Sequence, residues 1–173
     1  MDMPRSPQLV ARLASLRSKT AASWIREGWQ LLSGVPGGPR IFARLLGLAI
    51  PYTGSLGAEI LVLEHGHARV QLVERRAIKN HLNSIHAIAL CNLAELTGNL
   101  ALVYALPEDS RFIVTALSIE YKKKARGVII ADCQCRPPTT AEKQEYELAV
   151  TLTDASEAVV ATATLKTLVS PAR

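Results

Sequence analysis

The sequence predicts an α+β fold in which an antiparallel β-sheet wraps around one long central helix. Three observations predict it. An apolar segment, 84–106, has Glu95 as its only formally charged residue and suits a buried helix. Two strand-like segments precede it, and four segments rich in β-forming residues follow it. This order is typical of a sheet packed against one helix.

The N-terminal part is expected to be helical and basic. Residues 8–33 show an approximate helical stripe of apolar side chains, and 40–49 is a second short helix that Pro51 ends. Residues 1–50 contain seven Lys and Arg against two Asp and Glu, whereas residues 51–173 contain thirteen of each. The main domain therefore lacks the basic excess of a nucleic-acid-binding domain. We expect the helices to pack on this domain or on another subunit; the alternative is contact with anionic membrane lipids.

We divide the chain into a basic helical extension with its linker, 1–37, and a main domain, 38–173. A chain of 173 residues that is 49% hydrophobic is long enough to bury a core. The strands are expected at 58–64, 68–75, 111–122, 127–136, 144–154 and 157–168.

The composition favours a cytoplasmic protein without a metal site. The spacing Cys133-x-Cys135 is not that of a zinc or redox pair, and we interpret these cysteines as small core residues. His65 and His67 flank a turn without a third ligand nearby, and the N-terminus does not resemble a secretory signal. The segment 84–106 is long enough to span a membrane, but the charge at its middle favours a core helix.

Polar residues gather where this apolar segment begins. Asn80, Asn83 and His86 lie there, and Glu95 follows nine residues after His86. A carboxylate is costly in apolar surroundings and is seldom kept there without a partner or a task. Either Asn83 or Ser84 is expected to be the helix N-cap. The combination predicts a reaction site at the start of a buried helix.

His86 and Glu95 of one chain cannot act on one substrate group if both are helical. Nine residues of α-helix turn by about 900°, half a turn out of register, and rise by about 13 Å. The two side chains could meet across a two-fold axis if helices from two chains lie antiparallel.

Several motifs follow one another along residues 38–170: Ala49-Ile-Pro-Tyr-Thr53, Asn80-His81, Ile85-His-Ala-Ile-Ala-Leu90, Asn92-Leu-Ala-Glu95 and Glu120-Tyr-Lys-Lys-Lys-Ala-Arg-Gly127. Together they resemble an uncharacterised family of hotdog-fold proteins. Asn80-x5-His86 with Glu95 also resembles the phenylacetyl-CoA type of hotdog acyl-CoA thioesterase.

The resemblance implies a hotdog fold, homodimers with active sites between the subunits, and hydrolysis of an acyl-CoA or acyl-pantetheine thioester. A tetramer of two dimers stays open. Asn80 and His86 of one chain would act with Glu95 of the other. Glu95 would be the general base or the nucleophile, Asn80 would hold the water or the thioester oxygen, and His86 would orient the carbonyl. No cofactor is implied, because coenzyme A is part of the substrate.

The remaining site residues are expected around this centre. Backbone N–H groups of Ala87 and Ile88 would stabilise an oxyanion, although thioesterases of this type often have glycine at these positions and at Asn83. The other residues are Asn83, Thr97, Gly98 and Asn99, which are expected to line the substrate pocket, and Lys122, Lys123, Lys124 and Arg126, which are expected to bind the phosphates of coenzyme A.

Plainer roles are open for the same residues. Asn80 could only brace its loop, His86 could be a core histidine, and Glu95 could be a structural carboxylate. Gly98 could only permit close helix packing, and the basic run could be a solvated strand end.

Two other functions are alternatives. His81 stands fourteen residues before Glu95, which resembles the His-to-Glu separation of acyl-carrier dehydratases, but the accompanying Pro-Gly-rich turn is missing. The absent glycines favour a non-catalytic module that holds acyl-CoA or lipid.

Overall fold

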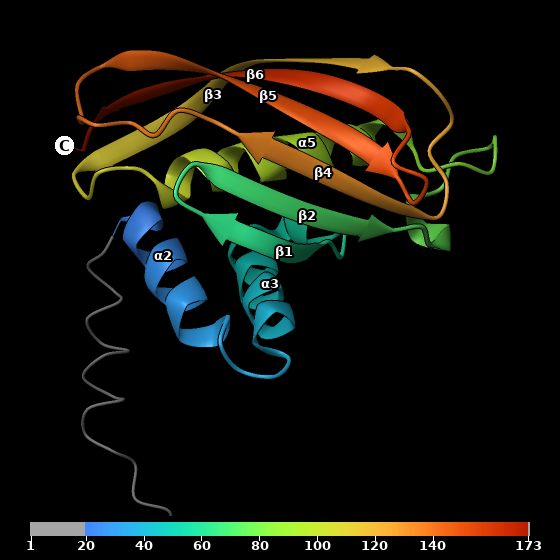
Figure 1. Cartoon of the computed structure of the whole chain (residues 1–173), viewed down its shortest axis with the longest axis horizontal. Helices are drawn as coiled ribbons and strands as arrows, with labels where there is room; N and C mark the ends of the chain where they lie inside the picture. The colour runs from blue at the N-terminus through green and yellow to red at the C-terminus, as the bar shows by residue number, and fades with distance from the viewer. Residues whose placement is uncertain (1–19, 173) are drawn as a thin grey trace, which may run out of the picture.

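In the computed structural model, which describes residues 20–172, six antiparallel strands form one curved sheet around a long helix, α5 (Figure 1). The strand order is β1-β2-β4-β5-β6-β3, so β1 and β3 form the two edges. This architecture confirms the predicted α+β fold. The strands are β1 (Glu59–Glu64), β2 (His67–Val73), β3 (Ser110–Tyr121), β4 (Val128–Gln134), β5 (Gln144–Asp154) and β6 (Val159–Pro171).

The strands lie close to their predicted positions because alternate side chains face the helix. Ala131 on β4 and Val150 and Leu152 on β5 are buried, whereas their neighbours along each strand are more exposed. β1 and β2 are joined by a tight turn in which Gly66 has φ 79°. A side chain at Gly66 would also meet the Cys135 carbonyl oxygen at 2.6 Å, so this turn requires glycine.

Helix α5 (Ala87–Tyr104) is the central element, and it begins three residues later than predicted. Ile85 forms an isolated antiparallel bridge with Lys79 and donates its N–H to the Ala125 carbonyl oxygen at 2.9 Å. These contacts with distant parts of the chain hold residues 84–86 outside the helix.

The N-cap of α5 is His86, so the prediction of Asn83 or Ser84 is wrong. His86 has extended backbone angles, φ −64° and ψ 140°, and its side chain accepts a hydrogen bond from the Ile88 N–H. A ring nitrogen therefore takes the place of the hydroxyl or amide oxygen that usually caps a helix.

Small residues let α5 lie close to the sheet. A Cβ added to Gly98 would stand 3.1 Å from Leu165 of β6 and 3.4 Å from Val150 of β5. Among the described residues, α5 is the one helix long and apolar enough to cross a membrane. It is nevertheless packed inside the sheet, and its buried leucines form the centre of the hydrophobic core.

The N-terminal helices pack below the sheet on the side of β1 (Figure 1). They are α2 (Ala21–Leu32), α3 (Gly38–Ala49) and the short α4 (Pro51–Gly54). The helix predicted at 8–33 is confirmed over 21–32, and its first part lies outside the described residues. The helix predicted at 40–49 is confirmed as α3, but Pro51 starts α4 instead of ending the helical region.

Aromatic side chains join α2 and α3. Phe42 is fully buried, stacked on Trp24 with 6.0 Å between ring centroids and edge-on to Trp29 at 5.5 Å. Arg26 of α2 also donates to the Leu106 carbonyl oxygen beyond the end of α5, at 2.5 Å. α2 therefore shares the core of the main domain, while the division of the chain at residue 38 stays a prediction.

Replacing Phe42 by Ala tests whether the N-terminal helices contribute to the stability of the whole domain. We expect the free energy of unfolding to fall by about 3–5 kcal/mol, because the change removes a fully buried aromatic ring and leaves a cavity. Urea unfolding followed by circular dichroism measures it. Leu48→Ala is the control: this side chain is 79% exposed, so the change should stay within about 0.5 kcal/mol. A loss below 1 kcal/mol for Phe42→Ala would contradict a shared core.

Candidate functional site

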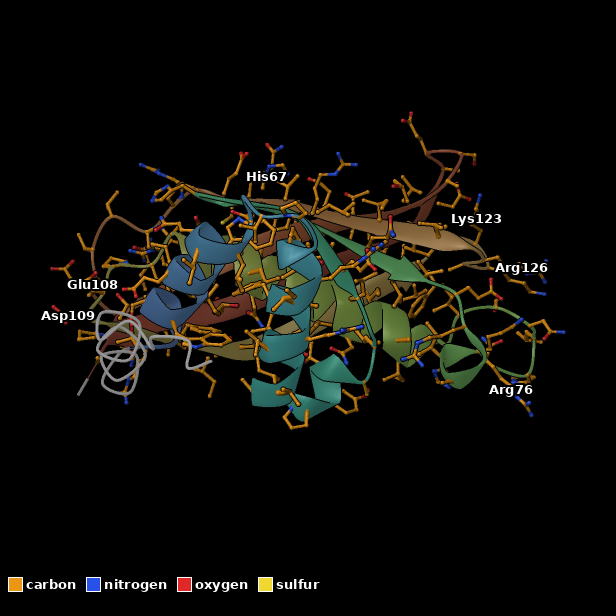
Figure 2. All side chains as sticks on the ribbon, turned by 90° about the horizontal axis from the view of Figure 1, so that it is seen from below. His67, Arg76, Glu108, Asp109, Lys123 and Arg126 are labelled. Atoms are coloured by element: carbon orange, nitrogen blue, oxygen red, sulfur yellow. The ribbon has the colours of Figure 1, made fainter. Side chains whose placement is uncertain are left out.

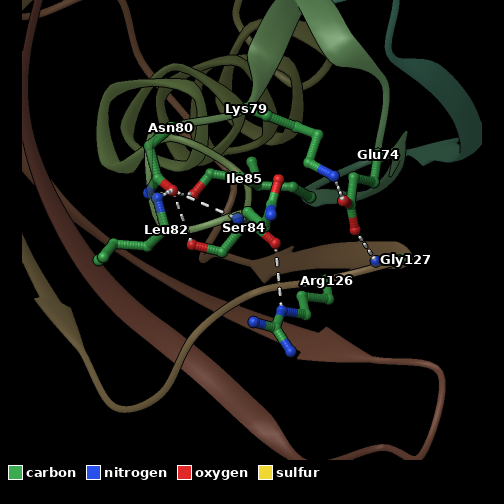
Figure 3. A network of polar contacts seen from close by, with 9 residues as sticks. Glu74, Lys79, Asn80, Leu82, Ser84, Ile85, Arg126 and Gly127 are labelled. Carbon is green, nitrogen blue, oxygen red and sulfur yellow. Dashed lines mark hydrogen bonds and ion pairs between the residues drawn. The ribbon is translucent and has the colours of Figure 1, made fainter.

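Asn80 organises the loop that leads into α5 (Figure 3). Its Oδ1 accepts hydrogen bonds from the Leu82 N–H at 2.9 Å, and from the Ser84 N–H and Ser84 Oγ, each at 3.2 Å. Its Nδ2 donates to the Ile85 carbonyl oxygen at 3.5 Å. The amide oxygen is thus occupied by its own loop, and one Nδ2 hydrogen has no acceptor among the described residues.

The same loop is fastened to the turn between β3 and β4. The Arg126 guanidinium donates through Nε to the Asn83 carbonyl oxygen at 3.2 Å (Figure 3). Asn83 has φ 53°, in the left-handed region that asparagine tolerates better than most residues. Asn83 therefore adopts a backbone conformation that glycine would also allow, and the loop keeps its shape without glycine.

His86 leaves a single free backbone donor at the start of α5. Its Nδ1 accepts the Ile88 N–H at 3.1 Å and therefore carries no proton in this arrangement. The Ala87 N–H has no acceptor among the described residues, whereas the Ile88 N–H is engaged. The expectation of two oxyanion donors, Ala87 and Ile88, is thus corrected to one, Ala87.

Glu95 lies on a face of α5 that the sheet does not cover. Ile88, Glu95 and Asn99 follow one another along this face at spacings of seven and four residues. Ile88 is 54% exposed, and Glu95 is half-buried. Within residues 20–172 the Glu95 carboxylate makes no hydrogen bond and no ion pair. It is a carboxylate in largely apolar surroundings that has no partner among these residues.

Two neighbours respond to this environment. Burial raises the pKa of the Cys91 thiol, and the nearby Glu95 carboxylate raises that pKa further. Burial and then Cys91 raise the pKa of Tyr121, whose hydroxyl donates to the Ala87 carbonyl oxygen at 3.0 Å. Tyr121 thereby ties the end of the edge strand β3 to the first turn of α5.

The structure does not bring Glu95 together with Asn80 and His86 in one chain. Helix α5 is continuous from Ala87, so Glu95 stands about 12 Å along its axis from the free Ala87 N–H. Asn80 and His86 lie at the start of the helix. A single substrate carbonyl group therefore cannot contact both the Ala87 N–H and the Glu95 carboxylate of the same chain.

Two of the four expected pocket residues face the wrong way. Thr97 is fully buried, and its hydroxyl donates back to the Leu93 carbonyl oxygen at 2.7 Å. Gly98 faces the sheet, as the alternative of close helix packing predicts. The prediction that Thr97 and Gly98 line a substrate pocket is therefore wrong. Asn83 is exposed at the loop, and Asn99 is half-buried on the uncovered face.

Sequence reasoning missed Asn92 as a candidate. It is 5% exposed, and its Oδ1 has no hydrogen-bond partner in the part of the chain that the structure describes, as is also true of the Asn99 Oδ1. A buried amide oxygen without a partner is uncommon, so Asn92 joins the candidate residues of this face. Its position three residues before Glu95, hence on nearly the same helix face, is the signal that could have identified it.

The basic run after β3 is partly neutralised. Lys122 pairs with Glu120, and Lys123 Nζ lies 2.6 Å from Asp154 Oδ2. The hydrogen bond from Lys123, together with one from Ser156, holds the pKa of Asp154 well below its usual range. Lys124 is exposed. Two of the four expected phosphate ligands are thus already engaged with carboxylates.

No group of three His, Cys, Asp or Glu side chains that could hold a metal occurs in the described part of the chain. The Nε2 atom of His67 instead lies 3.3 Å from Asp132 Oδ2. Cys133 is buried in the core, as predicted. Burial, with smaller effects from Cys135 and Asp132, raises its pKa to about 12, which makes it an unreactive thiol.

Two cavities flank the candidate residues. One, of about 590 Å³, lies between α3, α4 and β1 and reaches Leu96, the neighbour of Glu95. The other, of about 800 Å³, is open to solvent and lies beside Asn80 and Asn83. Both have the size of small-molecule sites.

Comparison with solved structures supports the fold. The protein is similar to the structural-genomics protein APC5556, with 27% identity, 86% of this chain and 99% of that chain covered, and a TM-score of 0.73. It is similar to PA5026 of Pseudomonas aeruginosa, described as a "Probable Thioesterase", with 25% identity, coverage of 79% and 97%, and a TM-score of 0.69. A thioesterase family protein of Silicibacter pomeroyi shares the fold at 16% identity, with coverage of 75% and 96% and a TM-score of 0.64.

Curated proteins give no match. The family model described as "Domain of unknown function (DUF4442)" matches residues 38–169, which include the loop at Asn80, all of α5 and the whole sheet except the end of β6. The chain therefore belongs to the DUF4442 family, and its fold is the hotdog fold.

Proposed function

We propose that the protein hydrolyses an acyl-CoA thioester at a site built from two copies of the chain. The observation that carries this proposal is the half-buried carboxylate of Glu95, which has no partner within residues 20–172 and stands about 12 Å from the free Ala87 N–H of its own helix. Both groups suit thioester hydrolysis, and similar structures from Pseudomonas aeruginosa and Silicibacter pomeroyi carry thioesterase names.

The proposed chemistry depends on the hydrogen-bond donors and the helix dipole at the start of α5. The thioester oxygen would accept the Ala87 N–H, and the positive end of the helix dipole would stabilise the negative charge that develops on that oxygen. The free Nδ2 hydrogen of Asn80 is a second donor at the same end of the helix. His86 would orient this end, because its ring caps the helix.

Glu95 of a second copy would supply the base. Its carboxylate takes a proton from water as the water oxygen bonds to the carbonyl carbon. The carbon–sulfur bond then breaks, and the thiolate of coenzyme A leaves with the proton from Glu95. Direct attack by the carboxylate, followed by hydrolysis of the resulting anhydride, is the alternative route.

A homodimer is supported by the surface next to this site. β3 is an edge strand, and Ile113 on it is 63% exposed. Unpaired strand edges with apolar side chains favour association. A second copy related by a two-fold axis would cover β3 and the uncovered face of α5, where Ile88 is exposed and the Asn99 Oδ1 lacks a partner among the described residues. Antiparallel α5 helices would then place Glu95 of each copy near Ala87 of the other.

A non-catalytic acyl-CoA-binding module is the second candidate. The occupied Ile88 N–H favours it, because a single backbone donor stabilises an oxyanion less than a pair does. The dehydratase alternative receives no comparable support: His81 is exposed in the loop and makes no hydrogen bond through its side chain among the described residues.

Glu95→Gln tests the catalytic role with little change in shape. We expect kcat to fall by a factor of about 10²–10⁴, because the amide cannot accept the proton of water. The measurement is free-thiol release from acyl-CoAs of short, long and aromatic acyl groups. Glu147→Gln, an exposed glutamate on β5, is the matched control. Unchanged turnover in Glu95→Gln would remove Glu95 from the reaction, and silence of the unaltered protein on every acyl-CoA would favour the binding module.

Mixed dimers test whether the site needs two chains. Asn80→Asp keeps the Oδ1 acceptor of the loop and removes Nδ2, both its free hydrogen and its long 3.5 Å bond to the Ile85 carbonyl oxygen, so we expect the loop to persist through Oδ1 while activity falls. Coexpressed with Glu95→Gln at equal levels, it should recover about a quarter of the normal activity, since half of the dimers would be mixed and each would hold one intact site. If the mixture stays as inactive as either variant alone, the two residues act within one chain.

A further inference from the structure

We propose that the open cavity beside Asn80 binds the phosphates of the coenzyme A part of the substrate. This inference rests on the proposed function, and it assigns the phosphate site to a different cluster from the basic run after β3. The cavity of about 800 Å³ lies between the segment 74–83 and the turn at Gly127. That volume suits a nucleotide-sized group.

Three basic side chains line this cavity. Arg75 follows β2, Arg76 begins the 3₁₀ helix η2 (Arg76–Ile78), and Lys79 comes directly after it. Arg75 uses one N–H on the Ser55 carbonyl oxygen and keeps its other donors. Arg76 makes no hydrogen bond or ion pair through its side chain among the described residues. It is therefore the most available cation of the cluster.

The single acidic residue of the lining, Glu74, already has two partners of its own. Its carboxylate accepts the Gly127 N–H at 2.6 Å and pairs with Lys79 Nζ at 2.9 Å (Figure 3). The bond from Gly127, and then that from Lys79, holds the pKa of Glu74 below its usual range. Each of its two oxygens thus has a donor, and the lining keeps a net positive charge because Arg75, Arg76 and Lys79 outnumber this one carboxylate.

Arg126 adds a positive charge next to the lining residues Asn83 and Gly127. It bonds the carbonyl oxygen of Asn83, which lines the cavity, through Nε alone. Arg76, Arg126 and Lys123 lie at one end of the molecule, whereas the acidic Glu108 and Asp109 lie at the other (Figure 2). Arginine binds phosphate through its fork of N–H groups, so this end of the molecule suits a phosphoanion.

The location fits a thioester substrate as well. Asn80 lines the cavity and also holds the loop that precedes the free Ala87 N–H. A pantetheine arm could thus run from the phosphates at Arg76 to the thioester at the start of α5. The basic run competes poorly for this role, because Lys122 and Lys123 are paired with Glu120 and Asp154.

Arg76→Glu is the test, compared on two substrates with the same acyl group. With acyl-CoA we expect KM to rise about tenfold or more and kcat to stay within about twofold, because one charge-assisted contact in the bound state becomes a repulsion. With the acyl thioester of N-acetylcysteamine, which has no phosphate, the variant should match the unaltered protein. Lys143→Glu, an exposed change of the same charge in the loop before β5, should leave both substrates unaffected.

Calorimetry with free coenzyme A separates this inference from the proposed function. Binding weakened about tenfold by Arg76→Glu would support the cavity even if no thioester were hydrolysed. Hydrolysis of acyl-CoA with a KM unchanged by Arg76→Glu would overturn the cavity and keep the enzyme. If Lys124→Glu raises the dissociation constant of coenzyme A tenfold and Arg76→Glu does not, the phosphates bind at the basic run instead. If Arg76→Glu weakens only the use of an acyl group attached to an acyl-carrier protein, the cavity is a contact surface for that protein and not a phosphate site. An unaltered protein that does not bind coenzyme A overturns the inference.

Discussion

The rigid geometry of α5 is the constraint on which the site depends. The helix runs without a break from Ala87, so the free N–H at its start and the Glu95 carboxylate stay about 12 Å apart along the axis. No side-chain movement closes that distance within one chain. If both groups act on one thioester, a second copy must supply one of them, which links the proposed activity to assembly.

The start of α5 is held by contacts from distant parts of the chain. Asn80 closes its loop through Oδ1, Ala125 and Arg126 fasten that loop to the turn after β3, and Tyr121 bonds the first carbonyl of the helix. Because these groups hydrogen-bond backbone atoms, they fix where the helix begins and where its free N–H lies. Asn80 therefore has a structural role in addition to its proposed catalytic one.

The elements of the fold could be predicted from the sequence because each rests on a local pattern. The long apolar run predicted α5, and the β-forming segments predicted the strands to within a few residues. The start of α5 could not be predicted, because Ile85 is held outside the helix by Lys79 and by the Ala125 carbonyl, which is forty residues away. These distant contacts, and not a local N-cap at Asn83 or Ser84, determine where the helix begins.

The site was harder to predict for a related reason. Helix α5 is apolar on nearly every side, so its sequence does not reveal which face the sheet covers, and Thr97 and Gly98 were assigned to the wrong face. The pairing of Lys123 with Asp154 joins distant segments and cannot be seen in the basic run itself. Glu95 was identifiable because a lone carboxylate in an apolar segment stands out without any knowledge of the fold.

A crystal structure with a non-hydrolysable acyl-CoA analogue, in which a methylene replaces the thioester sulfur, tests the two-chain site most directly. We expect the ketone oxygen to lie about 3 Å from the Ala87 N of one chain, with the carboxylate of Glu95 from another chain beside the carbonyl carbon. A carbonyl group that contacts Ala87 with no Glu95 carboxylate of a second chain near it, or an analogue bound away from the start of α5, would contradict the shared site.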